Sequence, residues 1–349
     1  MLKKWETWLG VGVSILSTFL LIITLRNLHI ADLWQIIINA QYSWLIPAVI
    51  VYFIGVWARV WRWHYLLRPI KIIPLSKMWA AVVIGYMGNN IYPLRAGEFI
   101  RAYVLKRSED IPVSAGLATV LVERIFDGVV MVIFVLIALP TIPNMPTWLR
   151  QTVIFTSLLF SIALLIFFAW ATMQKQARKI YIYLINLLVP SNLRNVILSI
   201  ADSFTEGLNS LRSFRDVMMV FITSVIAWLC ETTMYWLILR AFYHLDNLLL
   251  EKVSFVSAML VNGVVNLATM IPSAPGYIGT FDVVGVQAMS LFNIEQSVAA
   301  AYILVLHATL WLPITLFGLW YMFRESISWQ EFSKVAQKSN KGLTLQKKE

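Results

Sequence analysis

The sequence carries little charge and almost no cysteine. Only 13% of its 349 residues are charged and 59% are hydrophobic, whereas a typical soluble domain carries about 25% charged residues. This shortage of charge excludes a pair of ordinary soluble domains and indicates a polytopic α-helical membrane protein. The single cysteine, Cys230, excludes an intrachain disulfide and a cysteine-based metal cluster, and its apolar neighbours favour a buried thiol.

The motifs of well-known soluble enzymes are also missing. The sequence has no Walker A loop, zinc motif, hydrolase triad or dinucleotide-binding loop, and it lacks the Asp-x-Asp-like pair of many sugar transferases. The four histidines are scattered without metal-ligand spacing. We therefore expect no catalytic residue, no bound metal and no cofactor. Whether the chain is an enzyme stays open, with a non-enzymatic role favoured.

Long apolar runs cover most of the chain. Runs long enough for a transmembrane helix are predicted at about residues 8–25, 44–60, 115–139, 152–172, 217–241 and 298–323. The first run follows a basic segment, but it is long for a signal peptide and no cleavage site follows it, so an uncleaved helix is predicted. We predict one all-α integral membrane domain over residues 1–323 with about 6–8 transmembrane helices, and a polar cytoplasmic tail over residues 324–349.

Two clusters of helix-breaking residues interrupt apolar segments. The breakers are Asn89, Asn90, Pro93 and Gly97 in the first cluster and Pro272, Pro275, Gly276 and Gly279 in the second. Lipid-exposed backbone cannot tolerate such interruptions, because its freed N–H and C=O groups find no water there. Each cluster is therefore predicted to turn inside the membrane as a re-entrant helical hairpin buried in protein. A short interfacial turn is the alternative for the first cluster.

The basic residues predict the orientation of the chain. With the N-terminus in the cytoplasm, about 23 of the 28 Lys and Arg residues fall on the cytoplasmic side, as the positive-inside rule requires. This accounts for the net charge of +10 without a nucleic-acid partner. Both termini are then cytoplasmic, and amphipathic segments at 175–189 and 192–214 lie along the cytoplasmic interface. The two hairpins enter from opposite sides, and their shared Pro-to-Gly spacing favours an inverted repeat of the transporter kind.

Charged residues inside a predicted span are costly, so they mark a functional or a paired site. Glu123 and Asp127 share one helical face, and Arg124 and Asp127 are i,i+3 neighbours. One interpretation is a structural ion cluster that satisfies itself. The other is that Arg124 binds a ligand phosphate, which suits its planar guanidinium, while the carboxylates hold it in place.

A second group of charges lies beside the first breaker cluster. Arg95, Glu98 and Arg101 surround Gly97. If the helix resumes near Ala96, Glu98 and Arg101 are i,i+3 neighbours. The glycine-rich turn would then expose backbone N–H groups to an anion at the helix start. This is a hypothesis for a phosphate site.

Other polar residues have two interpretations each. Arg59 and Arg62 alternate with tryptophans and are interpreted as an interfacial anchor. Glu231, in mid-span, needs a cation or a proton, or else is a neutral hydrogen-bonded acid. Asp282 either caps a half-helix or joins a polar cavity. His307 is predicted to be a packed histidine rather than a proton relay.

Three motifs, in this order, resemble a known family. They are Gly88-Asn89-Asn90-x2-Pro93-x-Arg95-x-Gly97-Glu98-x2-Arg101, then Glu123-Arg124-x2-Asp127, then Pro272-x2-Pro275-Gly276-x2-Gly279. Together they resemble the lysylphosphatidylglycerol synthase/flippase transmembrane-domain family over about residues 8–323. The family's best-known member also has a soluble aminoacyl-transferase domain. This sequence continues for only about 25 residues after its last predicted span, so we do not expect that domain here. The resemblance therefore implies the lipid-translocating part and not the synthase.

The resemblance implies a flippase-like transporter of an anionic lipid, either a phospholipid or a polyprenyl-phosphate-linked lipid, in the cell membrane. Arg95, Arg101 and Arg124 would contact the phosphate. The supporting polar cavity would contain Asn89, Asn90, Glu98, Glu123, Asp127, Glu231 and Asp282. The alternatives are a membrane glycosyltransferase, or another enzyme acting on a lipid phosphate, and a non-catalytic membrane partner of a separate enzyme. Membrane lipids are the expected partners, and a homo-oligomer or a partner enzyme stays open.

Overall fold

The computed structural model describes residues 30–142, 173–190, 214–244, 252–270 and 274–333, together with isolated positions outside these ranges. In this part of the chain the regular structure is helical and contains no strand, so the predicted all-α fold is confirmed. Apart from isolated positions, the predicted spans at 8–25 and 152–172 lie outside the described residues. So do Pro272 and most of the amphipathic segment at 192–214.

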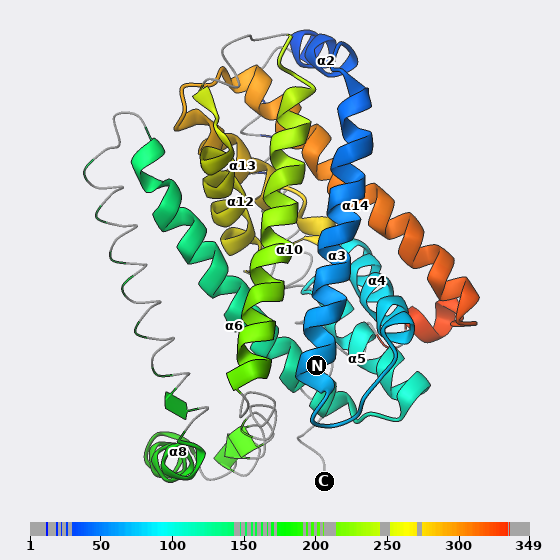
Figure 1. Cartoon of the computed structure of the whole chain (residues 1–349), viewed down its shortest axis with the longest axis vertical. Coiled ribbons are helices and arrows are strands. Elements are labelled where there is room, and N and C mark those ends of the chain that lie inside the picture. Colours follow the sequence, from blue (N-terminus) through cyan, green and yellow to red (C-terminus); the bar gives the residue numbers. More distant parts are fainter. Residues whose placement is uncertain are drawn as a thin grey trace.

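Four of the described helices are long, with 23 to 29 residues each (Figure 1). They are α3 (Leu45–Leu67), α6 (Val113–Ala138), α10 (Phe214–Arg240) and α14 (Gln296–Arg324). Of the helices described, α3, α10 and α14 are long and apolar enough to cross a membrane. Helix α6 has a comparable length of 26 residues but carries the charged Glu123-Arg124-x2-Asp127 motif. The predicted total of about 6–8 transmembrane helices stays a prediction.

Two helical hairpins fill the space between the long helices. The first consists of α4 (Leu75–Ile91) and α5 (Ala96–Glu109), and the second of α12 (Phe255–Thr269) and α13 (Thr280–Ser290). In Figure 1 the first hairpin occupies the lower half of the molecule and the second the upper half. Their arms have 11 to 17 residues, fewer than the roughly 20 that cross a bilayer. The opposed hairpins match the predicted shape, while their entry into a membrane stays a prediction.

The turn of the first hairpin is tightly constrained. Leu94 and Arg95 have φ angles of 60° and 56°, and such left-handed backbone costs a non-glycine residue about 1–3 kcal/mol. The surrounding packing must therefore fix this turn. The two arms also press together, because a Cβ atom on Gly97 would lie 1.9 Å from the carbonyl oxygen of Gly85. Only glycine allows this approach of the two backbones.

The packing partners repeat between the two halves of the chain. Taken in order, α3, α4, α5 and α6 correspond to α10, α12, α13 and α14. Helix α4 packs against α14, and its counterpart α12 packs against α6. Helix α5 packs against α6 as α13 packs against α14, and α3 packs against its own counterpart α10. Exchanging each helix for its counterpart therefore leaves the set of packing partners unchanged. An inverted repeat with opposed hairpins predicts this arrangement.

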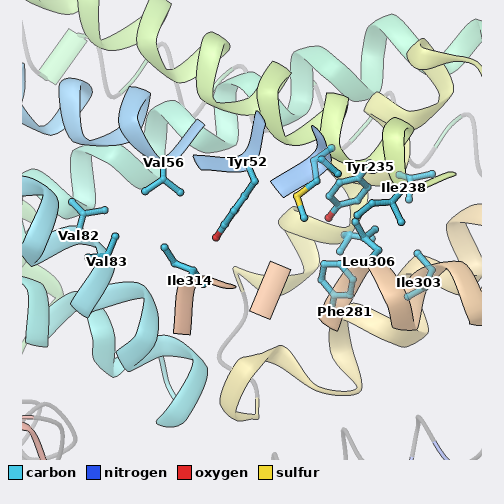
Figure 2. Close-up of a cluster of buried hydrophobic side chains, with 14 of the residues drawn as sticks. Tyr52, Val56, Val82, Val83, Tyr235, Ile238, Phe281, Ile303, Leu306 and Ile314 are labelled. Atoms are coloured by element: carbon cyan, nitrogen blue, oxygen red, sulfur yellow. The ribbon is translucent and has the colours of Figure 1, made fainter. Parts of the chain in front are cut away.

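Buried apolar side chains tie the hairpins to the long helices. Figure 2 shows a cluster to which α3 contributes Tyr52 and Val56, α4 Val82 and Val83, α10 Tyr235 and Ile238, α13 Phe281, and α14 Ile303, Leu306 and Ile314. None of these side chains is more than 7% exposed. Because lipid is as apolar as these side chains, close packing rather than escape from water stabilises such contacts. The cluster fixes the two hairpins relative to each other.

The lower end of the molecule carries an amphipathic helix. Helix α8 (Gln174–Leu188) is found where an amphipathic segment is predicted. It exposes Ile180, Tyr183, Leu184 and Leu187. Figure 1 shows α8 nearly end-on at the lower left, so it lies across the direction of the long helices. This orientation suits a helix in the membrane interface, and that location stays a prediction.

Glu109, the last residue of α5, closes the open end of the first hairpin. Its carboxylate accepts a hydrogen bond from Lys77 Nζ at 2.5 Å and lies 2.9 Å from Lys71 Nζ. The hydrogen bonds from Lys77 and Lys71 hold the pKa of Glu109 below its ordinary value. Because folding lowers the pKa of this carboxyl group, its negative charge stabilises the folded state. This stabilisation is fully present at pH values above the unfolded-state pKa. That stabilisation is lost as the pH falls through the lowered pKa.

We therefore expect Glu109→Gln to destabilise the protein at neutral pH and to lose this effect in acid. The measurement is the thermal midpoint of unfolding in detergent for wild type and variant over a series of pH values. The two midpoints should differ at neutral pH and converge as the pH falls below the ordinary carboxyl range. A difference that stays constant across the series would show that the carboxylate charge is not what stabilises this end.

Candidate functional site

A cavity lies between the turns of the two hairpins. Together with the solvent at its opening, it holds about 1070 Å³ of space free of protein atoms. It is lined by residues of both hairpins and of all four long helices. The predicted residues in its lining are Asn89, Asn90, Arg95, Gly97, Glu98, Arg101, Arg124, Asp127, Glu231 and Gly276. Glu123 and Asp282 lie behind this lining and pair with Arg101 and His307, which belong to it. Pro93, Pro275 and Gly279 belong to the two hairpin turns.

Arginines and carboxylates form one connected ion-pair network in and behind the cavity wall. Its members are Arg62, Arg95, Arg101 and Arg124 with Glu98, Glu123 and Asp127. Counted over the residues that the structure describes, four guanidinium groups and three carboxylates give the network a formal charge of +1. Uncompensated charge is costly away from water, so the network favours the entry of one more negative group.

The deep part of the network is closed to solvent. Arg62 is fully buried, and its Nη1 and Nη2 atoms donate to the two oxygens of Asp127 at 2.5 and 3.4 Å. Arg101 Nη2 donates to Glu123 Oε2 at 2.5 Å. The Arg101 guanidinium also lies over the ring of Trp63, 4.4 Å from its centroid. Arg62 is held in place by Asp127 and Ser224 and supports the site, whereas Arg101 also belongs to the cavity lining.

Arg95 and Arg124 face the more open part of the cavity, with side chains 17% and 23% exposed. Both contact one carboxylate oxygen: Glu98 Oε1 lies 3.0 Å from Arg95 Nε and 3.7 Å from Arg124 Nε. Arg124 Nη2 lies 3.2 Å from Asp127 Oδ2. Arg124 Nε is buried without a hydrogen-bond partner. Each guanidinium has five N–H donors, so these two keep donors for a further anion.

The start of α5 does not present free backbone donors to the cavity. The helix begins at Ala96, as predicted. However, the Gly97 N–H donates to Asn89 Oδ1 at 2.9 Å, and the Glu98 N–H donates to the Arg95 carbonyl at 3.0 Å. The prediction that these N–H groups are exposed to an anion is therefore wrong, because Asn89 on α4 and the Arg95 carbonyl of the turn already accept from them. An anion in the cavity would meet side chains.

The charged side chains beside the first turn do not pair with the partners that their spacing in the sequence suggests. Glu98 and Arg101 are three residues apart on α5, as predicted, but their side chains turn to other partners. Glu98 pairs with Arg95 and Arg124, whereas Arg101 pairs with Glu123 on α6. The predicted contact between Arg124 and Asp127 is present.

Arg59 and Arg62 are the residues that the sequence interpretation misplaced. An interfacial anchor would be exposed, but these two are 5% and 0% exposed. Arg59 Nη2 lies 2.5 Å from Glu231 Oε2, so Glu231 is paired with a cation. Helix α3 continues to Leu67, beyond the predicted end of the span at Val60, which carries both arginines inward. Their i,i+3 spacing within an apolar stretch was the signal that could have identified them.

Asparagines brace the cavity wall. Asn90 Nδ2 donates to Thr315 Oγ1 at 2.7 Å and to the Trp311 carbonyl at 3.2 Å, both on α14. On the opposite side, Asn266 Nδ2 donates to Glu231 Oε1 at 3.1 Å. These amides connect each hairpin to a long helix.

The chain is similar to known proteins over most of its length. The family model described as the lysylphosphatidylglycerol synthase TM region matches residues 7–318. A UPF0104 membrane protein of Methanocaldococcus jannaschii is 25% identical over 308 residues, which cover 83% of this chain and 89% of that protein. One from Pyrococcus horikoshii is 23% identical over 329 residues, covering 87% and 96%. The glycosyltransferase AglD of Haloferax volcanii is 24% identical over 290 residues, covering 75% of this chain and 46% of that protein.

Proposed function

Because the chain belongs to the lysylphosphatidylglycerol synthase transmembrane-region family, we propose that its cavity carries the headgroup of an anionic lipid across the membrane. The lipid is a phospholipid or a polyprenyl-phosphate-linked lipid. Its phosphate enters the cavity while its apolar chains stay in the bilayer. The protein is an integral membrane protein, and the proposal includes a location in the cell membrane with both termini in the cytoplasm.

The observation that carries this proposal is the formal charge of +1 on the ion-pair network. The two arginines of that network nearest the open cavity, Arg95 and Arg124, share the carboxylate of Glu98. A phosphate oxygen placed between them would supply the missing negative charge, and planar guanidinium groups bind phosphate by paired N–H donors. A neutral or zwitterionic headgroup would leave the network less well compensated.

Each charged residue then has a separate role. Arg95 and Arg124 contact the phosphate first, and Glu98 exchanges its partners as the phosphate arrives and leaves. Arg101 contacts the phosphate when Glu123 pairs with Arg62 or Arg124 instead. Both of these arginines already lie within 3.7 Å of the Glu123 carboxylate. The opposed hairpins provide the two sides between which access alternates, as in other transporters built from inverted repeats.

The experiment that tests the proposal measures lipid movement by the purified wild-type chain in liposomes. Fluorescent phosphatidylglycerol and a fluorescent polyprenyl phosphate are placed in both leaflets, and an impermeant quencher reports which molecules face outward. We expect the protein to speed the loss of the protected pool for at least one of these anionic lipids. A fluorescent phosphatidylcholine serves as the zwitterionic control and should move more slowly.

Equal rates with and without protein, for both anionic lipids, would contradict this function. The name of the relative AglD favours one alternative, an enzyme that transfers a sugar to a lipid phosphate. The same proteoliposomes are therefore incubated with radiolabelled sugar nucleotides and polyprenyl phosphate. A labelled lipid product in the absence of lipid movement would support that alternative instead.

A further inference from the structure

His307 on α14 is bound at both of its ring nitrogens. Its Nδ1 atom lies 2.8 Å from Asp282 Oδ1, and its Nε2 atom lies 2.7 Å from the carbonyl oxygen of Gly276. The side chain is 13% exposed and belongs to the cavity lining. The ring thus sits between a carboxylate on α13 and the backbone of η4 (Pro275–Tyr277), the turn of the second hairpin.

The hydrogen-bond partners of this ring favour a positively charged imidazolium. A carbonyl oxygen and a carboxylate accept hydrogen bonds, and a neutral imidazole has only one N–H to donate. While Asp282 is ionised, both contacts are satisfied together only by the imidazolium form, which has two N–H groups. The remaining way to satisfy both is a protonated Asp282. However, Asp282 Oδ2 also accepts the Gly279 N–H at 2.8 Å at the start of α13, where a negative charge is favoured.

The ring of Phe281 provides a second observation for a cation. Its centroid lies 4.5 Å from that of the His307 ring, with an angle of 32° between the planes. An aromatic face at this distance attracts a cation. A positive imidazolium is therefore held by a carboxylate, by a carbonyl oxygen and by an aromatic face.

The bond to Gly276 links this charge to the position of the second hairpin's turn. Gly276 has a φ of 61°, and a Cβ atom there would lie 2.7 Å from Trp311 Nε1. Trp311 lies one helical turn beyond His307, and its Nε1 atom donates to the Asn90 carbonyl of the first hairpin at 3.4 Å. One face of α14 therefore binds the second hairpin through His307 and the first through Trp311.

We propose that His307 is a proton-binding site whose protonation fastens the turn of the second hairpin to α14, so that lipid movement is coupled to a proton. Loss of the proton leaves either Asp282 or the Gly276 carbonyl without its donor, which favours release of the turn. The proton passes to water in the cavity. Raising the pH therefore favours the released state. This inference rests on the proposed lipid transport and adds its driving ion.

Several other charged or titratable groups face the space that His307 shares. Those in the cavity lining are Tyr52 and Arg59 of α3, Tyr86 of α4, Arg95 of the first turn, Glu98 and Arg101 of α5, Arg124 and Asp127 of α6, Glu231 of α10 and Tyr277 of η4. Asp282 lies behind this lining. Among the described contacts, it is the charged residue that pairs with His307. The network charge of +1 lies across the same cavity, so an arriving anion favours the protonated ring.

The first test reads the proton directly and needs no lipid movement. The protein is labelled with ¹⁵N-histidine, and the His307 signals are identified by their absence from His307→Gln. At the pH of the transport assay we expect both ring nitrogens of His307 to show the chemical shift of N–H nitrogens. In Asp282→Asn, whose amide can still cap α13, one nitrogen should lose its proton. A neutral His307 ring in the wild-type protein overturns the proposal.

The second test applies a pH difference across the proteoliposome membrane. The wild-type transport rate should change by about 5-fold or more between opposite gradients, and His307→Gln should lose this dependence. His244→Gln, at an exposed site bonded to the Asn39 carbonyl, is the matched control and should keep it. Lipid movement that does not depend on the gradient, or a gradient effect that survives in His307→Gln, overturns the proposal.

If the wild type moves no lipid at any gradient, the proposed function fails, and the NMR result alone decides the proton site. If His307→Gln does not fold, Asp282→Asn takes its place.

Discussion

Replacing Asp127 with asparagine is expected to destabilise the protein by about 3–5 kcal/mol. Asp127 is 1% exposed and accepts from the fully buried Arg62 and from Trp228 Nε1, the latter at 2.7 Å. Asparagine has nearly the same shape, so no cavity is created. It removes the counter-charge of Arg62 and turns an NH₂ group toward guanidinium N–H donors. Among the described residues, Arg62 then keeps Glu123, at 3.6 Å, as its one ionic partner.

The measurement is the free energy of unfolding in detergent, compared with that of a matched control. Asp202→Asn makes the same chemical change at a pair with Arg178, whose side chains are 39% and 58% exposed. Such an exposed pair is worth at most about 1 kcal/mol. Similar losses for both variants would refute the account of Asp127. The double variant Arg62→Met with Asp127→Leu removes both buried charges and should recover part of the lost stability.

The hairpins were accessible to sequence reasoning because their determinants are local. A proline and glycines within a few residues interrupt a helix wherever the chain lies. The breaker cluster at residues 85–101 therefore predicted the end of α4 and the restart of the helix at Ala96, and both are found. The repeated Pro-to-Gly spacing pointed to two related halves, and the exchange of packing partners between them agrees with it.

The pairing of charges was not accessible in the same way. Arg59 and Arg62 find their partners 172 and 65 residues away in the chain, and no local rule relates such positions. A run of arginine and tryptophan is common at membrane interfaces, so their local sequence favoured the wrong location. The residues for which spacing sufficed, Arg124 and Asp127, lie on one helix. Tertiary packing decided the remaining pairs.

Replacing Arg124 with glutamine is expected to weaken binding of the anionic headgroup by about 10- to 100-fold, because a hydrogen bond to a charged group contributes about 1.5–3 kcal/mol. Its effect on stability should be small beside that of Asp127→Asn. The ionic contacts of Arg124 are 3.2 to 3.7 Å long, and its side chain is 23% exposed. The substitution lowers the formal charge of the network from +1 to zero. Glu98→Gln raises that charge to +2 and frees both cavity arginines, so it should strengthen binding.

Opposite effects of Arg124→Gln and Glu98→Gln are what distinguish an anion site from a merely structural cluster. Retention of anionic lipid by native mass spectrometry and the transport rate in liposomes measure binding and movement separately. Arg178→Gln, at an exposed pair on α8, is the matched control and should change neither. Arg124→Lys keeps the charge but loses the planar fork, so it should fall between wild type and glutamine. If both substitutions, Arg124→Gln and Glu98→Gln, weaken lipid retention equally in folded protein, the network holds the helices together and does not bind phosphate.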